Sequence, residues 1–227
     1  MRTSDQRSDT VRAMITACLM LFTDGAGAAI NDDCSLILES SIADETKEGL
    51  MDAAARGHLY RVDAGRSSVS FSVQHFPFSS VRGRFHAFDG GLVGIDTSSP
   101  DEQILFVIKS DSVDTGDAEI NSLIRSASFF DTAMFPDIVF TGRQIELHEG
   151  GSASIHGEVT VRNITRPLSL EVELDEADLA DRAATGQLHL QAQTRLDRTQ
   201  HGMDDLQLIV SDTVELELEL YLKRVSF

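Results

Sequence analysis

The stretch Val214–Leu222 reads VELELELYL, and it decides the fold class because apolar and acidic residues alternate along it. Val214, Leu222 and the leucines between them fall on one face, while the glutamates fall on the other. Successive side chains of a β-strand point to opposite faces of a sheet. The stretch therefore predicts a strand with one buried and one solvated face, as in antiparallel sheets.

The same period of two recurs from Leu59 onward, in segments separated by short turn signals. We expect strands at Ser68–His75, Val81–Phe88, Leu92–Ile95, Gln103–Ser110, Ile138–Thr141, Arg143–His148, Ala153–Val161, Arg166–Leu174, Gln187–Leu196 and in the last stretch. Asp114–Phe130 interrupts them, because Ile120, Leu123 and Ile124 recur there at helical spacing. About eight antiparallel strands close into a barrel that holds side chains or one small ligand. The sequence predicts an all-β, extended antiparallel barrel of about eight strands with a short helical insertion.

The overall composition is that of a globular protein. The chain has 227 residues, of which 41% are hydrophobic and 25% are charged, so it can bury a self-sufficient core. Its formal net charge of −18 argues against non-specific binding to nucleic acids or to anionic membranes, because both need a basic surface. We expect no nucleic-acid partner.

The first residues have the order of a secretory signal. Arginines precede the apolar run Ala13–Phe22, and the small residues of Ala26–Ala28 follow it. A membrane span needs about 20 apolar residues, so this run is too short to be a stable span. We expect residues 1–29 to be a cleaved signal peptide and the mature protein to be periplasmic or secreted.

Residues 30–58 differ from the alternating region and are expected to form a partly helical N-terminal extension ahead of a barrel domain at 59–227. Ser41 and Asp44 have the spacing of a helix start, and a helix is expected from Ala43 to Arg56. Cys34 either stays a free thiol or pairs between chains. Whether the protein forms a homodimer therefore stays an open question.

Phenylalanines gather in the segment Phe71–Phe88, which holds five of the 12 in the chain. They either fill a core or line a tunnel. A tunnel would suit a long hydrocarbon, because burial of its carbons contributes about 25 cal/mol per Å² without directional chemistry. On the strand at Gln103–Ser110, Phe106 and its neighbours Ile104 and Ile108 share one face. Leu105 and Val107 share the other, and periodicity does not decide which face is inside.

Several motifs in order, between Leu59 and Lys223, resemble the YceI-like family. They are Tyr60–Asp63 followed by Ser68–His75, Gly83–Phe85, Phe88–Gly90, Ser112–Gly116, Arg125–Asp131 (RSASFFD), Phe135–Phe140 (FPDIVF), Gly157–Pro167 and Asp197–Met203. The resemblance implies a secreted, lipocalin-like extended β-barrel. It also implies an internal pore for a polyisoprenoid or another long apolar chain, in a family not known for enzymes.

Apolar spacing and resemblance together predict the site. Ten side chains are expected to line the pore: Phe71, Val73, Phe76, Phe85, Phe88, Phe106, Ile108, Phe129, Phe130 and Phe140. His75, Arg82 and Arg84 are candidate contacts for a polar head group, since guanidinium groups bind phosphate and carboxylate in a bidentate manner. The alternatives are a histidine satisfied at a strand end and two surface cations.

One segment departs from the family pattern. The family carries Arg-Asp-x-His-Leu before its RSxxFFD signature, whereas this chain has INSLI at Ile120–Ile124. We therefore expect any head group to be held differently here. In the predicted loop near the C-terminus lie Asp197, Arg198, His201 and Asp204, which are interpreted as solvated.

No catalytic residue, metal site or cofactor is predicted, because the chain lacks a G-x-S-x-G elbow and H-E-x-x-H spacing. The resulting hypothesis is a binding protein that stores or carries a long-chain apolar lipid, either an isoprenoid or a quinone. Two alternatives stay open. One is a stress-response or interaction module with a solid core, and the other is an enzyme acting on an isoprenoid lipid inside the pore.

Overall fold

The computed structural model describes residues 36–37, 40, 42, 46–49, 59–93, 103–148, 151–174 and 185–225. The predicted signal peptide and Cys34 lie outside the described residues. Of the helix expected at Ala43–Arg56, the described part at 46–49 is helical.

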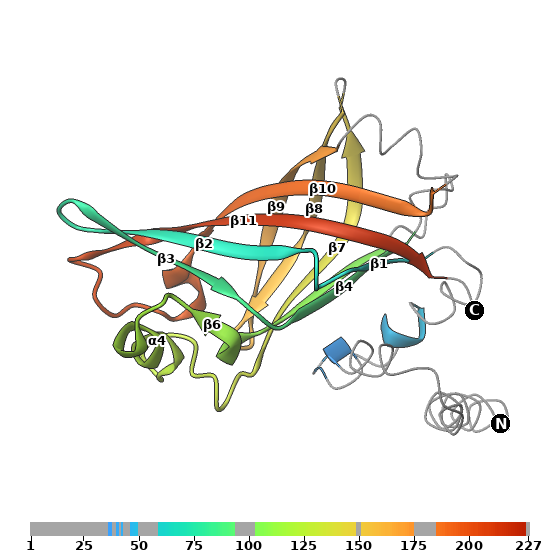
Figure 1. The fold of residues 1–227 in the computed structure, drawn as a ribbon. Coiled ribbons are helices and arrows are strands. Elements are labelled where there is room, and N and C mark those ends of the chain that lie inside the picture. The colour runs from blue at the N-terminus through green and yellow to red at the C-terminus, as the bar shows by residue number, and fades with distance from the viewer. Residues whose placement is uncertain are drawn as a thin grey trace, which may run out of the picture.

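The described residues form strands, the α-helix α4, two short 3-10 helices and the helical residues 36–37 and 46–49 of the N-terminal extension (Figure 1). The strands are β1 (Leu59–Val62), β2 (Ser68–His75), β3 (Ser79–Phe85), β4 (Phe88–Val93), β5 (Gln103–Lys109), β6 (Val113–Asp114), β7 (Asp137–Leu147), β8 (Ser152–Val161), β9 (Ile164–Leu174), β10 (Gln187–Asp197) and β11 (Val210–Val225). The helices are η1 (Ser110–Ser112), α4 (Ala118–Arg125) and η2 (Arg198–His201).

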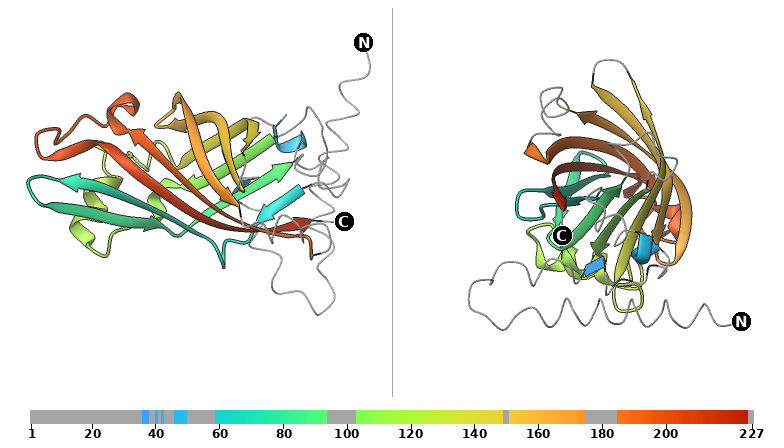
Figure 2. Two further views of the ribbon diagram at one scale, coloured as in Figure 1. Left: turned by 90° about the horizontal axis from the view of Figure 1, so that it is seen from above. Right: turned by 90° about the vertical axis from the view of Figure 1, so that its right-hand side faces the viewer.

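The sheet closes on itself as an antiparallel barrel in the order β1, β4, β5, β7, β8, β9, β10 and β11, with β11 pairing back to β1. The long strand β11 pairs with two different strands along the same edge. Its C-terminal part pairs with β1, and Val210–Glu219 pair with β2, which leads on to β3 and β6. Strands β2, β3 and β11 therefore extend beyond the barrel at one end, away from the C-terminus (Figure 2). The predicted all-β barrel with a short helical insertion is confirmed.

Two predicted boundaries were wrong for the same physical reason, which is the use of glycine inside strands. The segment from Phe88 to Gly91 was expected to turn, but it is the start of β4. A Cβ atom on Gly90 would lie 2.5 Å from Cδ2 of Phe106 on β5, so glycine is needed here for close packing. Gly142 likewise does not end a strand, because β7 runs through it with a bulge between Gly142 and Gln144.

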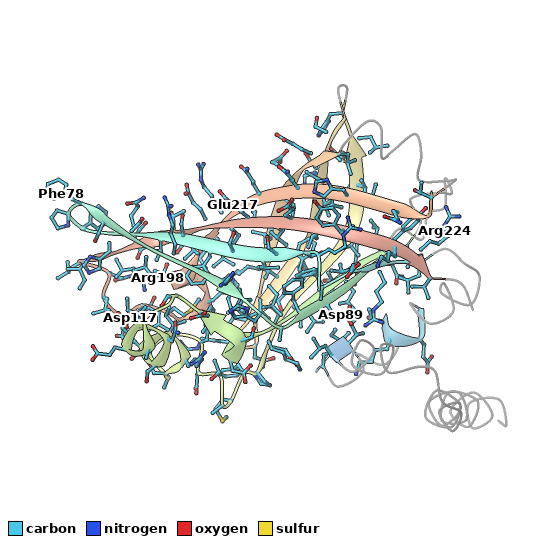
Figure 3. All side chains as sticks on the ribbon, viewed as in Figure 1. Phe78, Asp89, Asp117, Arg198, Glu217 and Arg224 are labelled. Carbon is cyan, nitrogen blue, oxygen red and sulfur yellow. The ribbon has the colours of Figure 1, made fainter. Side chains whose placement is uncertain are left out.

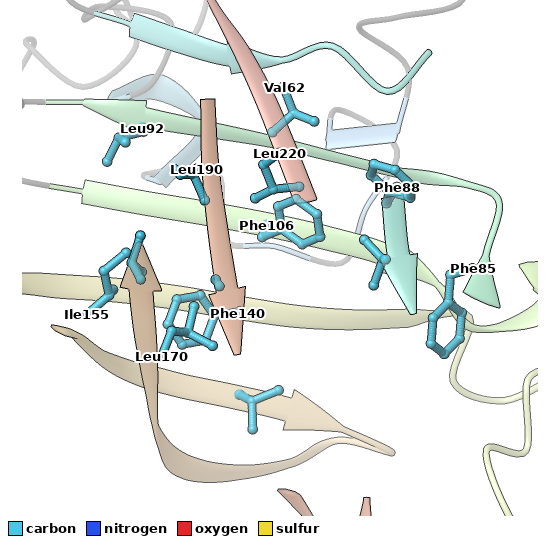
Figure 4. Close-up of a cluster of buried hydrophobic side chains, with 14 of the residues drawn as sticks. Val62, Phe85, Phe88, Leu92, Phe106, Phe140, Ile155, Leu170, Leu190 and Leu220 are labelled. Atoms are coloured by element: carbon cyan, nitrogen blue, oxygen red, sulfur yellow. The ribbon is translucent and has the colours of Figure 1, made fainter. Parts of the chain in front are cut away.

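The inner face of the sheet forms the hydrophobic core (Figure 4). Phe106 and its strand neighbours Ile104 and Ile108 face inward. On the opposite face of β5, Leu105 and Val107 are also fully buried, because they form a second cluster with Ile37 and Ile42 of the N-terminal extension. Both faces of β5 are thus apolar, which explains why periodicity alone did not assign the inside.

Candidate functional site

An apolar cavity lies inside the barrel, with about 190 Å³ of space open to the centres of water-sized molecules. One water needs roughly 10–15 Å³ by this measure, so the interior is hollow and not merely imperfectly packed. The wall is built from the barrel strands together with β2, β3, α4 and the segment that follows α4. Thr194 and Arg198 contribute the polar side chains of the described wall.

The hollow depends on phenylalanine rings that lie against glycines of the neighbouring strand. Phe71 on β2 is opposite Gly83 on β3, and Phe106 on β5 is opposite Gly90 on β4. A Cβ atom on either glycine would come within 2.5 Å of the ring. Because each ring occupies the space that a side chain would otherwise take, it lies along the wall and leaves the centre of the barrel open.

The two ends of the cavity differ in burial. On β11, the inward-facing Leu220 and Leu222 are 8% and 4% exposed, whereas Val214, Leu216 and Leu218 are only half-buried. We call the end near Val214, at the β2–β3 hairpin, α4 and η2, the open end. We call the end near Leu222, where β1 meets the C-terminal part of β11, the closed end.

Tyr60 is buried near the closed end and is 1% exposed. The Nη2 atom of Arg224 donates a hydrogen bond of 2.7 Å to the Tyr60 hydroxyl, and the guanidinium carbon lies 5.3 Å from the centroid of the Tyr60 ring. Figure 3 shows Arg224 at this end and Arg198 toward the other. The cavity wall on β11 is therefore buried near Leu222 and half-exposed near Val214.

Helix α4 and the following segment bring aromatic residues to the open end. Arg125, the last residue of α4, donates through Nε to the Asp111 carbonyl at 2.8 Å and through Nη2 to the Val113 carbonyl at 2.6 Å. This anchor fixes the helix to β6. Phe129 and Phe130 then reach the cavity wall, and the Phe130 ring lies 5.9 Å from that of Phe85.

The segment that departs from the family pattern has a structural role outside the cavity. Asn121 accepts hydrogen bonds of 2.8 Å from the backbone and hydroxyl of Thr115, and it donates to Asp114 at 3.1 Å. The Gly116 amide, Asn121 and His86 lower the pKa of Asp114 to about 2, in that order of importance. Of this segment only Ile124 reaches the cavity wall. The departing segment Ile120–Ile124 is therefore part of helix α4, with Asn121 bonded to neighbouring residues and Ile124 on the cavity wall.

Arg198 and His201 correct the expectation of a solvated loop, since each is 2% exposed. Arg198 lies at the open end of the cavity, and its guanidinium donates to the carbonyls of Ser211 (2.9 Å), Asp205 (2.7 Å), Val210 (3.1 Å) and Met203. These bonds hold the segment before β11 against the barrel. Strand alternation carries no signal for a buried cation that is satisfied by backbone carbonyls, so the burial of Arg198 was not predicted.

His201 packs beside this network. Its Nδ1 atom donates a hydrogen bond of 3.0 Å to the Ile164 carbonyl, because a carbonyl oxygen can only accept. Burial lowers the pKa of His201 below its ordinary value of 6.5, although the bond to Ile164 opposes the shift. His201 is therefore a neutral, structural histidine that ties η2 to β9.

The structure places eight of the ten predicted lining side chains on the cavity wall: Phe71, Val73, Phe85, Phe106, Ile108, Phe129, Phe130 and Phe140. Phe88 is buried but stacks beside Phe106, with the ring centroids 5.8 Å apart, and does not line the cavity. Phe76 is 54% exposed at the tip of the β2–β3 hairpin. That any of these residues contacts a ligand stays a prediction.

The three candidate head-group residues do not line the cavity. Arg82 and Arg84 are exposed on the outer face of β3, because Phe85 next to Arg84 points inward and neighbours on a strand alternate. His75 is half-buried at the end of β2, where its Nδ1 atom lies 3.1 Å from the Ser79 hydroxyl. The readings as surface cations and as a strand-end histidine agree with this placement.

The described residues contain no cluster of three or more histidine, cysteine, aspartate or glutamate side chains that could hold a metal ion. Among the same residues, no helix is long and apolar enough to cross a membrane.

Comparisons with known proteins agree with the geometry. The sequence model of the YceI-like domain matches residues 60–222. Protein YceI of Salmonella newport (strain SL254) is 32% identical over 117 residues, which are 51% of this chain and 61% of that protein. The chain thus matches about three fifths of the length of this curated relative.

Two solved structures share the fold. BcnA of Burkholderia cenocepacia aligns with a TM-score of 0.61 and 18% identity, over 70% of this chain and 98% of that chain. A polyisoprenoid binding domain from Saccharophagus degradans, implicated in plant cell wall breakdown, aligns with a TM-score of 0.55 and 17% identity, over 73% and 98% of the two chains.

Proposed function

Because the chain belongs to the YceI-like domain family, we propose that it binds a long apolar molecule inside its barrel. The proposed ligand is a polyisoprenoid lipid or an isoprenoid quinone. The protein would hold it for storage or transport, in the periplasm or outside the cell. The similarity in fold to a polyisoprenoid binding domain of Saccharophagus degradans supports the ligand class.

The observation that carries the proposal is the chemistry of the cavity wall. Its two polar side chains in the described residues are already engaged. Thr194 donates to the Ser169 carbonyl at 2.7 Å, and the guanidinium of Arg198 is shared among backbone carbonyls. A ligand portion inside this wall therefore finds apolar contact and no competing polar partner, which favours hydrocarbon.

The length of hydrocarbon inside the cavity would set the affinity. Each buried CH₂ contributes about 0.8 kcal/mol, so one five-carbon isoprene unit contributes roughly 4 kcal/mol before the costs of association. A micromolar complex needs about 8 kcal/mol net. A few isoprene units suffice, and a specific head-group contact is not required.

Two alternatives receive less support. A module with a solid core fits less well with the apolar cavity inside the barrel. An enzyme would need several titratable groups that converge on one point. In the described wall Arg198 is the titratable side chain, and its hydrogen bonds already serve the loop before β11.

The test is lipid extraction and uptake. Protein purified under native conditions should yield an isoprenoid lipid or quinone by mass spectrometry, and the emptied protein should take up a fluorescent polyprenol from dilute detergent. Ala192→Phe should abolish uptake, because Ala192 is buried on the wall. Gln193→Phe on the exposed face of the same strand is the matched control. Recovery of no lipid, together with no uptake by the wild type, would contradict the proposal.

A further inference from the structure

Exposed apolar side chains gather at the open end of the barrel. Phe76 and Phe78 of the β2–β3 hairpin are 54% and 98% exposed, and Leu208 in the segment before β11 is 95% exposed. Together with Leu206 and Ile209, at 42% and 43%, they make up five of the eight large apolar side chains that are exposed in the described residues. We call these five residues the apolar rim.

The two segments of the rim lie side by side. The Phe76 amide donates a hydrogen bond of 2.8 Å to the Ile209 carbonyl, and His75 is paired with Val210 in the sheet. Both segments project beyond the barrel at the end opposite the C-terminus, and Phe78 is at the extremity (Figures 2 and 3). Single exposed apolar residues are common, but a contiguous group marks an interaction surface.

The rim continues directly into the cavity wall. Val73 and Val210 line the cavity, and they lie on β2 and β11 close to Phe76 and next to Ile209. An apolar path therefore leads from fully exposed tips, through half-buried residues, to the buried wall at Leu220. A hydrocarbon ligand that leaves a bilayer along this path would avoid water for most of its length.

We propose that the apolar rim docks on the surface of a lipid bilayer, so that the mouth of the cavity meets the hydrocarbon region. This inference rests on the proposed function, since it gives the route by which an apolar ligand enters. Phe78 and Leu208 insert at the interface as an apolar wedge on two loop tips. A partner protein of matching shape is not needed, because side chains that protrude singly can enter between lipid head groups.

The charges define the kind of bilayer. The whole chain carries −18, so an anionic surface repels it. Near the rim the exposed charges are mixed, with Asp204 and Asp205 beside Leu206, Asp212 on β11 and Arg82 on β3. The surface that fits is therefore a zwitterionic one, such as phosphatidylcholine, and added anionic lipid should not strengthen binding.

The test measures binding of the full chain to phosphatidylcholine vesicles by co-sedimentation. The double variant Phe78→Ser with Leu208→Ser should bind at least about tenfold more weakly, because two apolar insertions are lost. Leu147→Ser is the matched control. Leu147 is 74% exposed at the end of β7, away from the rim, and its replacement should leave binding unchanged. All three proteins should take up a polyprenol equally well from dilute detergent.

The outcomes separate the two proposals. Equal vesicle binding by the double variant and the wild type, or no vesicle binding by the wild type, overturns docking while detergent uptake still reports on the cavity. Dimerisation that depends on concentration and disappears in the double variant, without any effect of vesicles, overturns docking in favour of a second copy of the chain. Vesicle binding without uptake of polyprenol from detergent leaves docking standing and overturns the proposed function.

Discussion

The closed and open ends of the barrel are built from the same kind of strand, yet they pack differently. At the closed end Leu222 pairs with Val62, and both side chains are buried on the cavity wall. At the open end the inward side chains of β11 are half-buried, and the arginine that lies there bonds to backbone carbonyls of a loop. The comparison indicates that burial at the closed end contributes most to stability, whereas the open end forms the mouth of the cavity.

The largest expected effect tests whether the open end has its own structural anchor. Arg198→Ala should lower the free energy of unfolding by about 3–5 kcal/mol, because it leaves several buried carbonyls without a donor. Urea denaturation measures this change. Arg195→Ala is the control, since its side chain is 76% exposed and pairs with Glu215 on the surface at 3.4 Å. That control should cost at most about 1 kcal/mol.

A direct comparison of the two ends comes from leucines on one strand. Leu222→Ala should cost about 2–5 kcal/mol, because a side chain that is only 4% exposed loses its buried apolar contacts. Leu216→Ala should cost less, since Leu216 is only half-buried and therefore loses less buried apolar surface. Equal losses of stability in the two variants would break the distinction between the ends.

The glycine contacts give the next effect. Gly90→Ala should destabilise the fold by about 1–3 kcal/mol through overpacking, because its Cβ atom would displace the Phe106 ring. The displaced ring should also reduce polyprenol uptake. Gly65→Ala is a suitable control, because its Cβ atom would approach Asp63 at an ordinary 3.6 Å. Unchanged uptake by Gly90→Ala would show that the ring does not need the glycine to clear the cavity.

The smallest effect concerns pH and His201. Its pKa in the folded state lies below the ordinary 6.5, so the unfolded chain takes up the proton first as the pH falls. The stability that His201 contributes is therefore complete above the unfolded pKa and is lost as the pH falls below it, toward the folded pKa. Unfolding by urea at about pH 7.5 and about pH 5 should show a smaller difference in His201→Asn than in the wild type.

The alternation of apolar and polar residues predicted the strands correctly, because successive side chains of a strand always point to opposite faces of the sheet. The leucines and glutamates of β11 face as predicted, and β2 has its predicted bounds. The same rule also placed most of the predicted wall, since Phe71, Val73 and Phe85 alternate with polar residues. The family resemblance added the aromatic pair after α4, which periodicity would not have assigned to the interior.

The remaining features depend on which strands become neighbours, and no single strand encodes that. Gly90 was interpreted as a turn residue because its partner Phe106 is distant in sequence. Arg82 and Arg84 were candidate contacts for a head group, but their register with β2 turns them to solvent. Arg198 is buried only because the chain folds back from Met203 to Val210 around it.

The second cluster on the outside of β5 has a consequence for handling the protein. Ile37 and Ile42 cover Leu105 and Val107, which are 1% and 0% exposed with that cover in place. A version truncated to start at Leu59 keeps all strand pairs of the barrel, but it exposes Leu105 and Val107 on the outer face of β5. Such a version would tend to self-associate in solution, so the N-terminal extension protects the barrel from aggregation by covering this apolar surface.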